Sequence, residues 1–300
     1  MLYQQKIPVS FSVVKRGKLT VLVKEGYQEC IQHILCDTES LYKRYGDNAG
    51  MKSGRGNYIS VPLKENHAER LIIKNYRHGG LFGKLFGGVF LNGDRPLIDI
   101  GINEVASQKG VPTAEVIAVT KRMFLGVFYR ANFISKEISG AVDIMQFLKE
   151  SPFEKIQKQK KVIIFALIKL IRKMHDIGIY HADLHLKNIL IKEGENGEFD
   201  AYIIDLDKSV VSESLTLRQR MKNLQRLDRF IEKVFWLSRS SYNSSFSRKV
   251  SLISKADRIR FLKYYMTCDT VVHRDWKRFL RQYQSYYSFH KFWWRIFGIF

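Results

Sequence analysis

The feature that most constrains this chain is a set of polar residues held between apolar segments near position 185. Residues 180–191 read YHADLHLKNILI, and residues 201–209 read AYIIDLDKS. Asp183 and Asn188 are five positions apart, and Asp205 follows Asn188 by seventeen. The apolar flanks predict short strands, so the polar residues are expected at strand ends and on loops.

The residue types in these segments suit transfer of a phosphoryl group. An aspartate and an asparagine at the H-x-D-x-x-x-x-N spacing, with a later aspartate after a strand, form the pattern of such a site. We expect Asp183 to accept or orient the proton of an acceptor hydroxyl, and Asn188 and Asp205 to hold Mg²⁺ against nucleotide phosphates. The alternative is that these residues cap turns. The presence of both halves of the pattern favours the chemical interpretation.

Two charged residues upstream fit the nucleotide half of this chemistry. Lys74 ends a predicted strand, and Glu104 lies on a predicted helix thirty residues later. In this order before the catalytic loop, they could form the ion pair that organises the phosphates of ATP. Taken alone, each would be an ordinary solvated charge.

Two backbone segments complete the predicted nucleotide site. Gly54 and Gly56 flank Arg55 ahead of a strand and could place backbone amides over the phosphates, although the third glycine of a G-x-G-x-x-G loop is missing. The backbone of Lys136 and Ile138 is expected to contact adenine. For both segments, a simple surface turn is the alternative.

The hydrophobic pattern predicts an α+β fold with two lobes. Residues 1–134 alternate strand-like runs with glycine-rich turns and read as an antiparallel sheet with attached helices. Residues 133–141, FISKEISGA, are expected to form a hinge. Residues 135–235 read as a mainly helical second lobe, in which Val162, Phe165 and Met174 belong to a largely buried helix that ends near Gly178.

Residues 236–300 form a predicted helical extension that is basic and aromatic. Its last part, WKRFLRQYQSYYSFHKFWWRIFGIF, mixes Arg and Lys with Trp276, Trp293 and Trp294. This composition is typical of segments that bind the headgroup region of a membrane. The alternative is that these aromatic side chains complete the core of the second lobe.

Net charge and cysteine content narrow the environment of the chain. Fifty Lys and Arg against 29 Asp and Glu give a net charge of +21, which attracts polyanions over long range. Nucleic acid is not expected as a partner, because no nucleic-acid motif accompanies the charge. Three cysteines without paired spacing predict a reduced intracellular protein. No apolar run approaches the ~20 residues needed to span a bilayer, so membrane association is expected to be peripheral.

These motifs resemble those of the lipopolysaccharide core kinase family, sugar kinases with a protein-kinase-like fold, and most closely its 3-deoxy-D-manno-octulosonic acid (Kdo) kinase branch. The resemblance covers roughly residues 50–235. It rests on HADLHLKNIL, on IIDLD with Asp207 where protein kinases prefer glycine, on GRG before the Lys74 strand, and on the basic glycine-rich segment 76–85, YRHGGLFGKL. The family pattern tends to end near the basic helix at residue 235.

The resemblance implies a bilobal kinase that uses ATP and Mg²⁺ to phosphorylate a sugar hydroxyl. Its acceptor would be a lipid-linked sugar of the Kdo-lipid A type. The enzyme would work as a peripheral protein at the anionic cytoplasmic face of the inner membrane of a Gram-negative bacterium. Heptose as the acceptor sugar, a Ser, Thr or Tyr protein kinase, and a catalytically silent membrane scaffold remain the alternatives.

Overall fold

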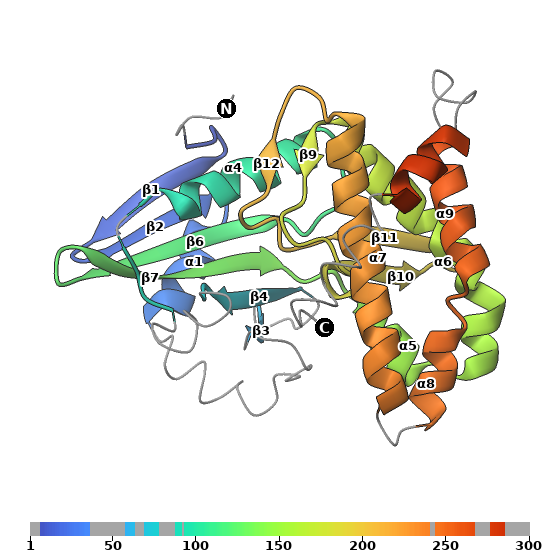
Figure 1. The fold of residues 1–300 in the computed structure, drawn as a ribbon. Coiled ribbons are helices and arrows are strands. Elements are labelled where there is room, and N and C mark those ends of the chain that lie inside the picture. Colours follow the sequence, from blue (N-terminus) through green and yellow to red (C-terminus); the bar gives the residue numbers. More distant parts are fainter. Residues whose placement is uncertain are drawn as a thin grey trace. The chain divides into compact units, whose positions relative to one another are not determined.

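The computed structural model divides the chain into two compact units, Met1–Ser139 and Gly140–Phe300. Figure 1 shows that strands dominate the first unit and helices the second. The two units confirm the predicted α+β fold, which combines an antiparallel sheet with a mainly helical part. The domain boundaries at residues 134 and 235 remain predictions. The described residues are 7–36, 58–63, 69–77, 88–91, 93–240, 244–267 and 277–285.

The first unit is built on a seven-stranded sheet in which every neighbouring pair is antiparallel. Its main path runs in the order β1 (Phe11–Arg16), β2 (Leu19–Lys24), β6 (Val116–Phe124), β7 (Phe128–Lys136), β4 (Arg70–Asn75) and β3 (Tyr58–Pro62), and β5 (Phe90–Leu91) pairs with β7. Residues 133–136 of the predicted hinge are therefore the end of β7 and are held by strand pairing on both sides.

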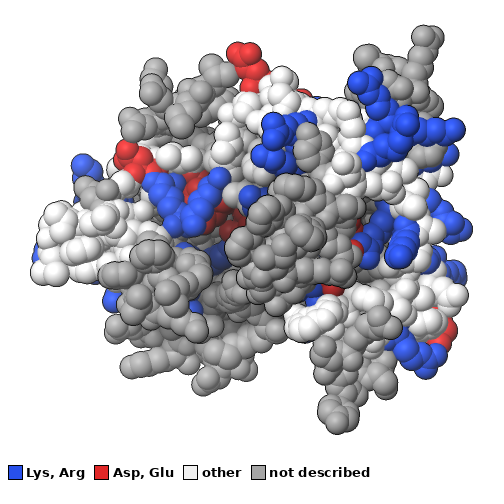
Figure 2. Space-filling model, viewed as in Figure 1, with Lys and Arg blue, Asp and Glu red and all other residues white. Residues whose placement is uncertain are grey.

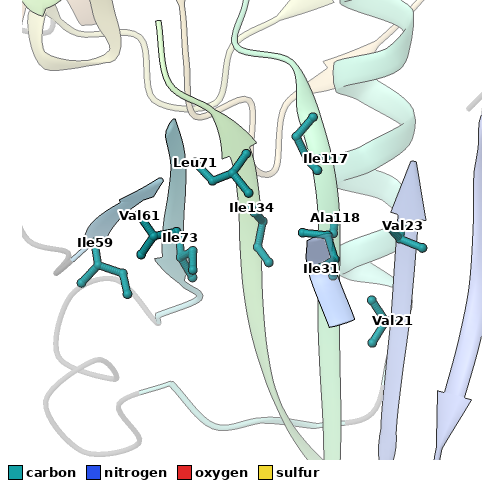
Figure 3. Packing of buried hydrophobic residues seen from close by; sticks show 10 residues of the cluster. All are labelled: Val21, Val23, Ile31, Ile59, Val61, Leu71, Ile73, Ile117, Ala118 and Ile134. Atoms are coloured by element: carbon teal, nitrogen blue, oxygen red, sulfur yellow. The ribbon is translucent and has the colours of Figure 1, made fainter. Parts of the chain in front are cut away.

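Alternating side chains give this sheet two apolar faces. One face packs on Ile31 of α1 (Gln28–Cys36) and includes Val21, Val23, Leu71 and Ile73 (Figure 3). The opposite face packs on Ile100 of α4 (Arg95–Gln108) and includes Leu22, Val119 and Tyr129. Because strand residues alternate between faces, neighbouring residues on one strand contact different helices.

The second unit consists of helices around short strands. The helices are α5 (Ile144–Glu150), α6 (Phe153–Asp176), α7 (Leu217–Ser240), α8 (Ser244–Ser251), α9 (Lys255–Thr267) and residues 277–285, with a 3₁₀ turn at η1 (Leu186–Asn188). Strands β11 (Phe199–Ile203), β10 (Ile189–Glu193) and β8 (Val142–Asp143) form one small sheet, and β12 (Val210–Val211) pairs with β9 (Ile179–Tyr180).

The two long helices bury one face each, as their apolar spacing predicts. On α6 the buried side chains include Ile163, Leu167, Leu170 and Met174. Val162 and Phe165 were expected on this buried face, but they are 41% and 45% exposed, because they lie more than a quarter-turn away from it on the helix surface. No helix in the described part of the chain is long and apolar enough to cross a membrane.

Part of the predicted extension beyond residue 235 packs into the helical unit. Helix α7 continues to Ser240 without a break. Phe279 and Tyr283 of the helix at 277–285 are buried, as expected if these aromatic residues complete the core. The aromatic residues Trp276, Trp293 and Trp294 lie outside the described residues.

Candidate functional site

The loop that carries Asp183 runs from β9 to β10 and meets the end of β11. Ile189 pairs with Ile203 in the β10–β11 hairpin, and the Ile204 amide donates to the Asn188 carbonyl at 3.0 Å. Asp205 is the next residue after Ile204, so the structure places Asn188 and Asp205 at the same end of one hairpin.

The Asn188 side chain is held against the backbone of Asp183. Its Nδ2 donates to the Asp183 carbonyl at 2.9 Å, and the side chain is buried. The amide oxygen of Asn188 is the remaining acceptor of this side chain. The Asp183 side chain is 77% exposed, which leaves its carboxylate accessible to a substrate.

Asp205 has an unusual backbone conformation for a residue with a side chain. Its φ is +62°, in the left-handed region that is sparsely populated outside glycine. Such conformations persist only where the surrounding structure imposes them, and they concentrate at functional sites. The following residues are tied to the catalytic loop, because the Ala182 amide donates to Ser209 Oγ at 3.2 Å.

His181 is a buried link between the two segments. Its Nδ1 accepts from the Asp183 amide at 3.0 Å, and its Nε2 lies 3.1 Å from the Ile204 carbonyl. Both contacts are satisfied together only by a neutral ring with its proton on Nε2. Burial lowers the pKa of His181 in spite of the Ile204 hydrogen bond and the nearby Asp205 and Asp183 charges, which keeps the ring in this form.

A chain of buried polar groups supports this loop from the helices. Asn223 of α7 holds the His181 backbone at both ends: its Oδ1 accepts from the amide at 3.1 Å, and its Nδ2 donates to the carbonyl at 2.7 Å. His175 Nε2 lies 3.1 Å from the same Oδ1, and Tyr265 Oη of α9 lies 2.6 Å from His175 Nδ1. Burial lowers the pKa of His175 to about 4 and raises that of Tyr265 to about 12. Both groups are thus neutral at pH 7.

His185 contacts the proposed catalytic carboxylate. Its Nε2 lies 3.4 Å from Asp183 Oδ2, and its ring stacks on Phe230 of α7 with centroids 4.8 Å apart. The His185 hydrogen bond lowers the pKa of Asp183 against the opposing effect of burial, and the charges of His185, His181 and Arg226 act in the same direction. The carboxylate is therefore ionised and ready to accept a proton.

In the first unit, Lys74 lies on the α4 side of the sheet. Its neighbours Leu71 and Ile73 belong to the cluster that packs on α1. Lys74 is opposite Phe133 on β7, and Phe133 packs with the cluster that contains Ile100 of α4. Opposite residues of a strand pair share a face, so Lys74 and α4 are on the same side.

Glu104 of α4 is buried and has two partners on this side of the sheet. Ser10 Oγ donates to it at 3.2 Å, and Lys24 Nζ lies 3.8 Å away. Burial would lower the pKa of Lys24, but the hydrogen bond and charge of Glu115 and the charge of Glu104 outweigh this effect and raise it. Lys24 is thus a second cation near Glu104, and the Lys74–Glu104 pair remains a prediction.

The predicted adenine contacts lie at the end of β7. The Lys136 amide donates to the Glu115 carbonyl at 2.8 Å, and the Glu137 amide donates to the Arg70 carbonyl at 2.8 Å. Because the backbone amide of Lys136 is already hydrogen-bonded within the sheet, its backbone carbonyl is the group that could bind a nucleotide. Ile138 follows the strand, and its contact with adenine remains a prediction.

The glycine segments lie outside the part of the chain that the structure describes. Gly54 and Gly56 are in residues 37–57, and most of the YRHGGLFGKL segment is in residues 78–87, two stretches that are not described. Their proposed roles rest on the sequence.

The oxygen donors at the hairpin end fit a magnesium ion. Asn188 offers an amide oxygen and Asp205 a carboxylate, and Mg²⁺ prefers oxygen ligands. Mg²⁺ usually takes only one or two carboxylate ligands and completes its shell with water and phosphate oxygens, so a small protein donor set suits it.

Several supporting residues were not singled out from the sequence. His185 lies within the HADLH motif, and a second histidine two positions after Asp183 was an available signal. His175, Asn223 and Tyr265 come from three different helices, so no local pattern could have linked them. Lys24 similarly meets Glu104 only through the pairing of strands and the packing of α4.

Comparison with known proteins places most of the chain in one sequence family. The model of the "Lipopolysaccharide kinase (Kdo/WaaP) family" matches residues 52–283. A 3-deoxy-D-manno-octulosonic acid kinase of Vibrio cholerae serotype O1 is 32% identical over 214 residues, which are 66% of this chain and 79% of that protein. A 3-deoxy-D-manno-octulosonic acid kinase of Haemophilus influenzae (strain PittEE) is 28% identical over 189 residues, 61% of this chain and 75% of that protein.

A solved structure has the same fold. The structure of WaaP in complex with acyl carrier protein matches 89% of this chain and 98% of its own chain, with a TM-score of 0.51 and 16% sequence identity. At this identity the likeness establishes the fold.

Proposed function

Because this chain belongs to the lipopolysaccharide kinase (Kdo/WaaP) family and is a kinase that phosphorylates a sugar of the lipopolysaccharide inner core, we propose that it transfers the γ-phosphate of ATP to a Kdo hydroxyl on a lipid A precursor. The observation that carries the proposal is the meeting of Asp183, Asn188 and Asp205 around one hairpin end, joined through the buried ring of His181.

Asp183 is the proposed catalytic base. Its ionised and exposed carboxylate accepts the proton of the acceptor hydroxyl as the oxygen attacks the γ-phosphorus and the bond to the leaving ADP oxygen breaks. His185 donates a hydrogen bond toward Asp183 Oδ2 and so orients the carboxylate. Stacking on Phe230 holds the His185 ring in place.

Asn188 and Asp205 are the proposed ligands of Mg²⁺. When bound, the ion neutralises the phosphate oxygens and stabilises the charge that develops during transfer. The two side chains are suited to this task because hydrogen bonds within the β10–β11 hairpin and the loop fix their backbones relative to each other.

The proposed ATP contacts come from the first unit. Lys74 would bind phosphates in an ion pair with Glu104, and the Lys136 carbonyl and the Ile138 backbone would contact adenine. Lys24, already beside Glu104, would compete for the same carboxylate. Gly54 and Gly56 would cover the phosphates with their amides.

The proposed location is the cytoplasmic face of the inner membrane, with peripheral attachment. A lipid-linked acceptor lies at that surface, and the net charge of +21 favours binding to an anionic bilayer.

Phosphate transfer to a defined acceptor tests the proposal. Purified protein should transfer label from γ-labelled ATP to a Kdo-bearing lipid A precursor, and Asp183→Asn should lower kcat about 10²- to 10⁴-fold, the range expected for loss of a general base. Asp200→Asn is the matched control, because Asp200 is an exposed carboxylate on β11. Protein that binds ATP but leaves the Kdo acceptor unlabelled would exclude Kdo, and labelling of a heptose-bearing acceptor alone would assign the heptose alternative.

A further inference from the structure

A row of basic side chains follows one face of α7. Its members, called the α7 ridge here, recur every three or four positions and therefore share one face of the helix. Arg218, Lys222 and Lys233 are exposed, whereas Arg226 and Arg229 are partly buried. The opposite face of α7 is apolar and includes the buried side chains Met221, Leu224 and Leu227.

Both acidic residues of α7 have a basic partner on α9. The helix contains two carboxylates, Asp228 and Glu232, and both are bound to Arg258 of α9, at 2.8 Å and 3.3 Å. Figure 2 shows Lys and Arg side chains gathered over the helical unit on the face seen in Figure 1, with few acidic side chains among them. The exposed part of the ridge consists of the three cations Arg218, Lys222 and Lys233.

The middle of the ridge contacts the catalytic loop. Arg226 Nη1 donates to the Ala182 carbonyl, one residue before Asp183. Phe230, one position after Arg229, stacks on His185, and His185 faces the Asp183 carboxylate. Arg218 and Lys233 are fifteen positions apart, which is about 22 Å at the rise of an α-helix, so basic groups extend from the proposed base in both directions.

Two exposed apolar side chains lie next to the C-terminal end of the ridge. Trp236 and Leu237 follow Lys233 on α7, and they are 54% and 50% exposed. Large apolar side chains next to a cationic stripe suit a ligand that is both anionic and lipophilic.

We propose that the α7 ridge binds the anionic groups of the acceptor, the phosphates of its lipid-linked disaccharide, and presents the attached sugar to Asp183. This inference rests on the proposed function, since the acceptor there is a phosphorylated, acylated glycolipid. The acyl chains lie toward Trp236 and Leu237, and the sugar hydroxyl lies toward the loop at Arg226. Cation–phosphate contacts supply affinity, and the rigid helix sets the distance between phosphates and reacting hydroxyl.

The test compares two pairs of lysines on matched helices. Lys222→Gln/Lys233→Gln removes two exposed charges, eleven residues apart, from the 24-residue α7. Lys158→Gln/Lys169→Gln removes two exposed charges, also eleven residues apart, from the 24-residue α6. Neither pair includes a residue that contacts Asp183 directly.

The ridge pair should raise the KM for the Kdo-bearing lipid A precursor by roughly tenfold or more, because each surface cation near an anionic group is worth a factor of about five. The KM for ATP should stay within twofold, and the α6 pair should behave as wild type. With a precursor lacking its disaccharide phosphates, the ridge pair and wild type should have equal KM. Equal KM changes for the two pairs, or no change for the ridge pair, would overturn the proposal.

Two further measurements separate the possible failures. Equilibrium binding of the precursor, measured without ATP, should be weaker for the ridge pair than for wild type. If this holds but wild type transfers no phosphate to Kdo, the proposed acceptor is wrong and the proposed role of the ridge is retained. If wild type transfers phosphate to Kdo and the ridge pair binds the precursor as tightly as wild type, only the proposed role of the ridge is wrong. A selective loss of binding to phosphatidylglycerol vesicles that contain no precursor would assign the ridge to general membrane contact instead.

Discussion

His175 and His181 are buried histidines, and burial lowers the pKa of both rings. Each ring uses one nitrogen as a donor and the other as an acceptor, and protonation would turn the acceptor into a second donor. His181 would then lose the hydrogen bond that its Nδ1 accepts from the Asp183 amide, and the Tyr265 hydroxyl would have to accept from His175 instead of donating to it. The local structure around the proposed base therefore depends on the protonation state of these two buried rings.

Lowering the pH should destabilise the protein through His175. An unfolded histidine has a pKa near 6.5, whereas burial lowers the pKa of His175 to about 4. Between these values the unfolded state binds a proton that the folded state does not, so stability present above pH 6.5 is lost as the pH falls toward 4. The loss from this residue should reach about 2 kcal/mol at pH 5.

Urea unfolding at pH 7 and pH 5 checks this expectation against His175→Gln, which cannot titrate. The free energy of unfolding of the variant should depend less on pH than that of wild type. The same pH dependence in both proteins would show that His175 does not carry the effect.

Among the secondary-structure elements, the junction of α6 and β9 sets the start of the loop that carries Asp183. Gly178 follows the end of α6 with φ +85°, and its carbonyl accepts from the Ser212 amide at 2.9 Å. A Cβ at this position would lie 1.8 Å from the Ser212 carbonyl oxygen. The chain can turn from the helix into the β9–β12 pair only because this residue has no side chain.

Gly178→Ala should destabilise the protein by at least about 3 kcal/mol, because it combines left-handed strain with a clash against backbone. Gly197→Ala is the matched control: Gly197 has φ +72°, and a Cβ there would meet nothing within 4 Å. Its cost should be about 1–2 kcal/mol, the strain alone. Urea midpoints measure both, and equal losses would show that the Ser212 contact is relieved by a small shift.

For the molecule as a whole, two segments are proposed to bind anionic lipid. One is the α7 ridge, and the other is the tail beyond residue 285, whose sequence has Lys291 and Arg295 among aromatic residues. The helix at 277–285 has a different role, since Phe279 and Tyr283 are buried and Tyr283 Oη donates to Asp228 at 3.4 Å. A truncation that tests membrane binding should therefore leave this helix intact.

Truncation after Ser285 should weaken binding to phosphatidylglycerol vesicles by tenfold or more, since each basic residue near an anionic surface contributes about 1 kcal/mol. Vesicle sedimentation measures the loss, and raised salt should reduce binding of the full chain. Circular dichroism controls for folding. Undiminished vesicle binding after truncation would show that the tail does not contribute to membrane attachment.

By itself, the sequence determined the two kinds of architecture and supplied the candidate reacting groups, whose roles remain a proposal. Asp183, Asn188 and Asp205 are recognisable because the phosphoryl-transfer pattern is a matter of spacing along one loop and one hairpin. The strands and long helices are recognisable because burial of one face imposes a local period of 2 or 3.6 residues. The family resemblance drew on the same local features.

Tertiary structure decided what surrounds those groups. The residue pattern did not show that residues 133–136 end a paired strand, that Lys24 approaches Glu104, or that Tyr265 of α9 supports His181 through His175 and Asn223. Each of these contacts joins segments far apart in the chain, where packing and the need to satisfy buried polar groups choose the partner. The local periodicity of the sequence does not identify these partners.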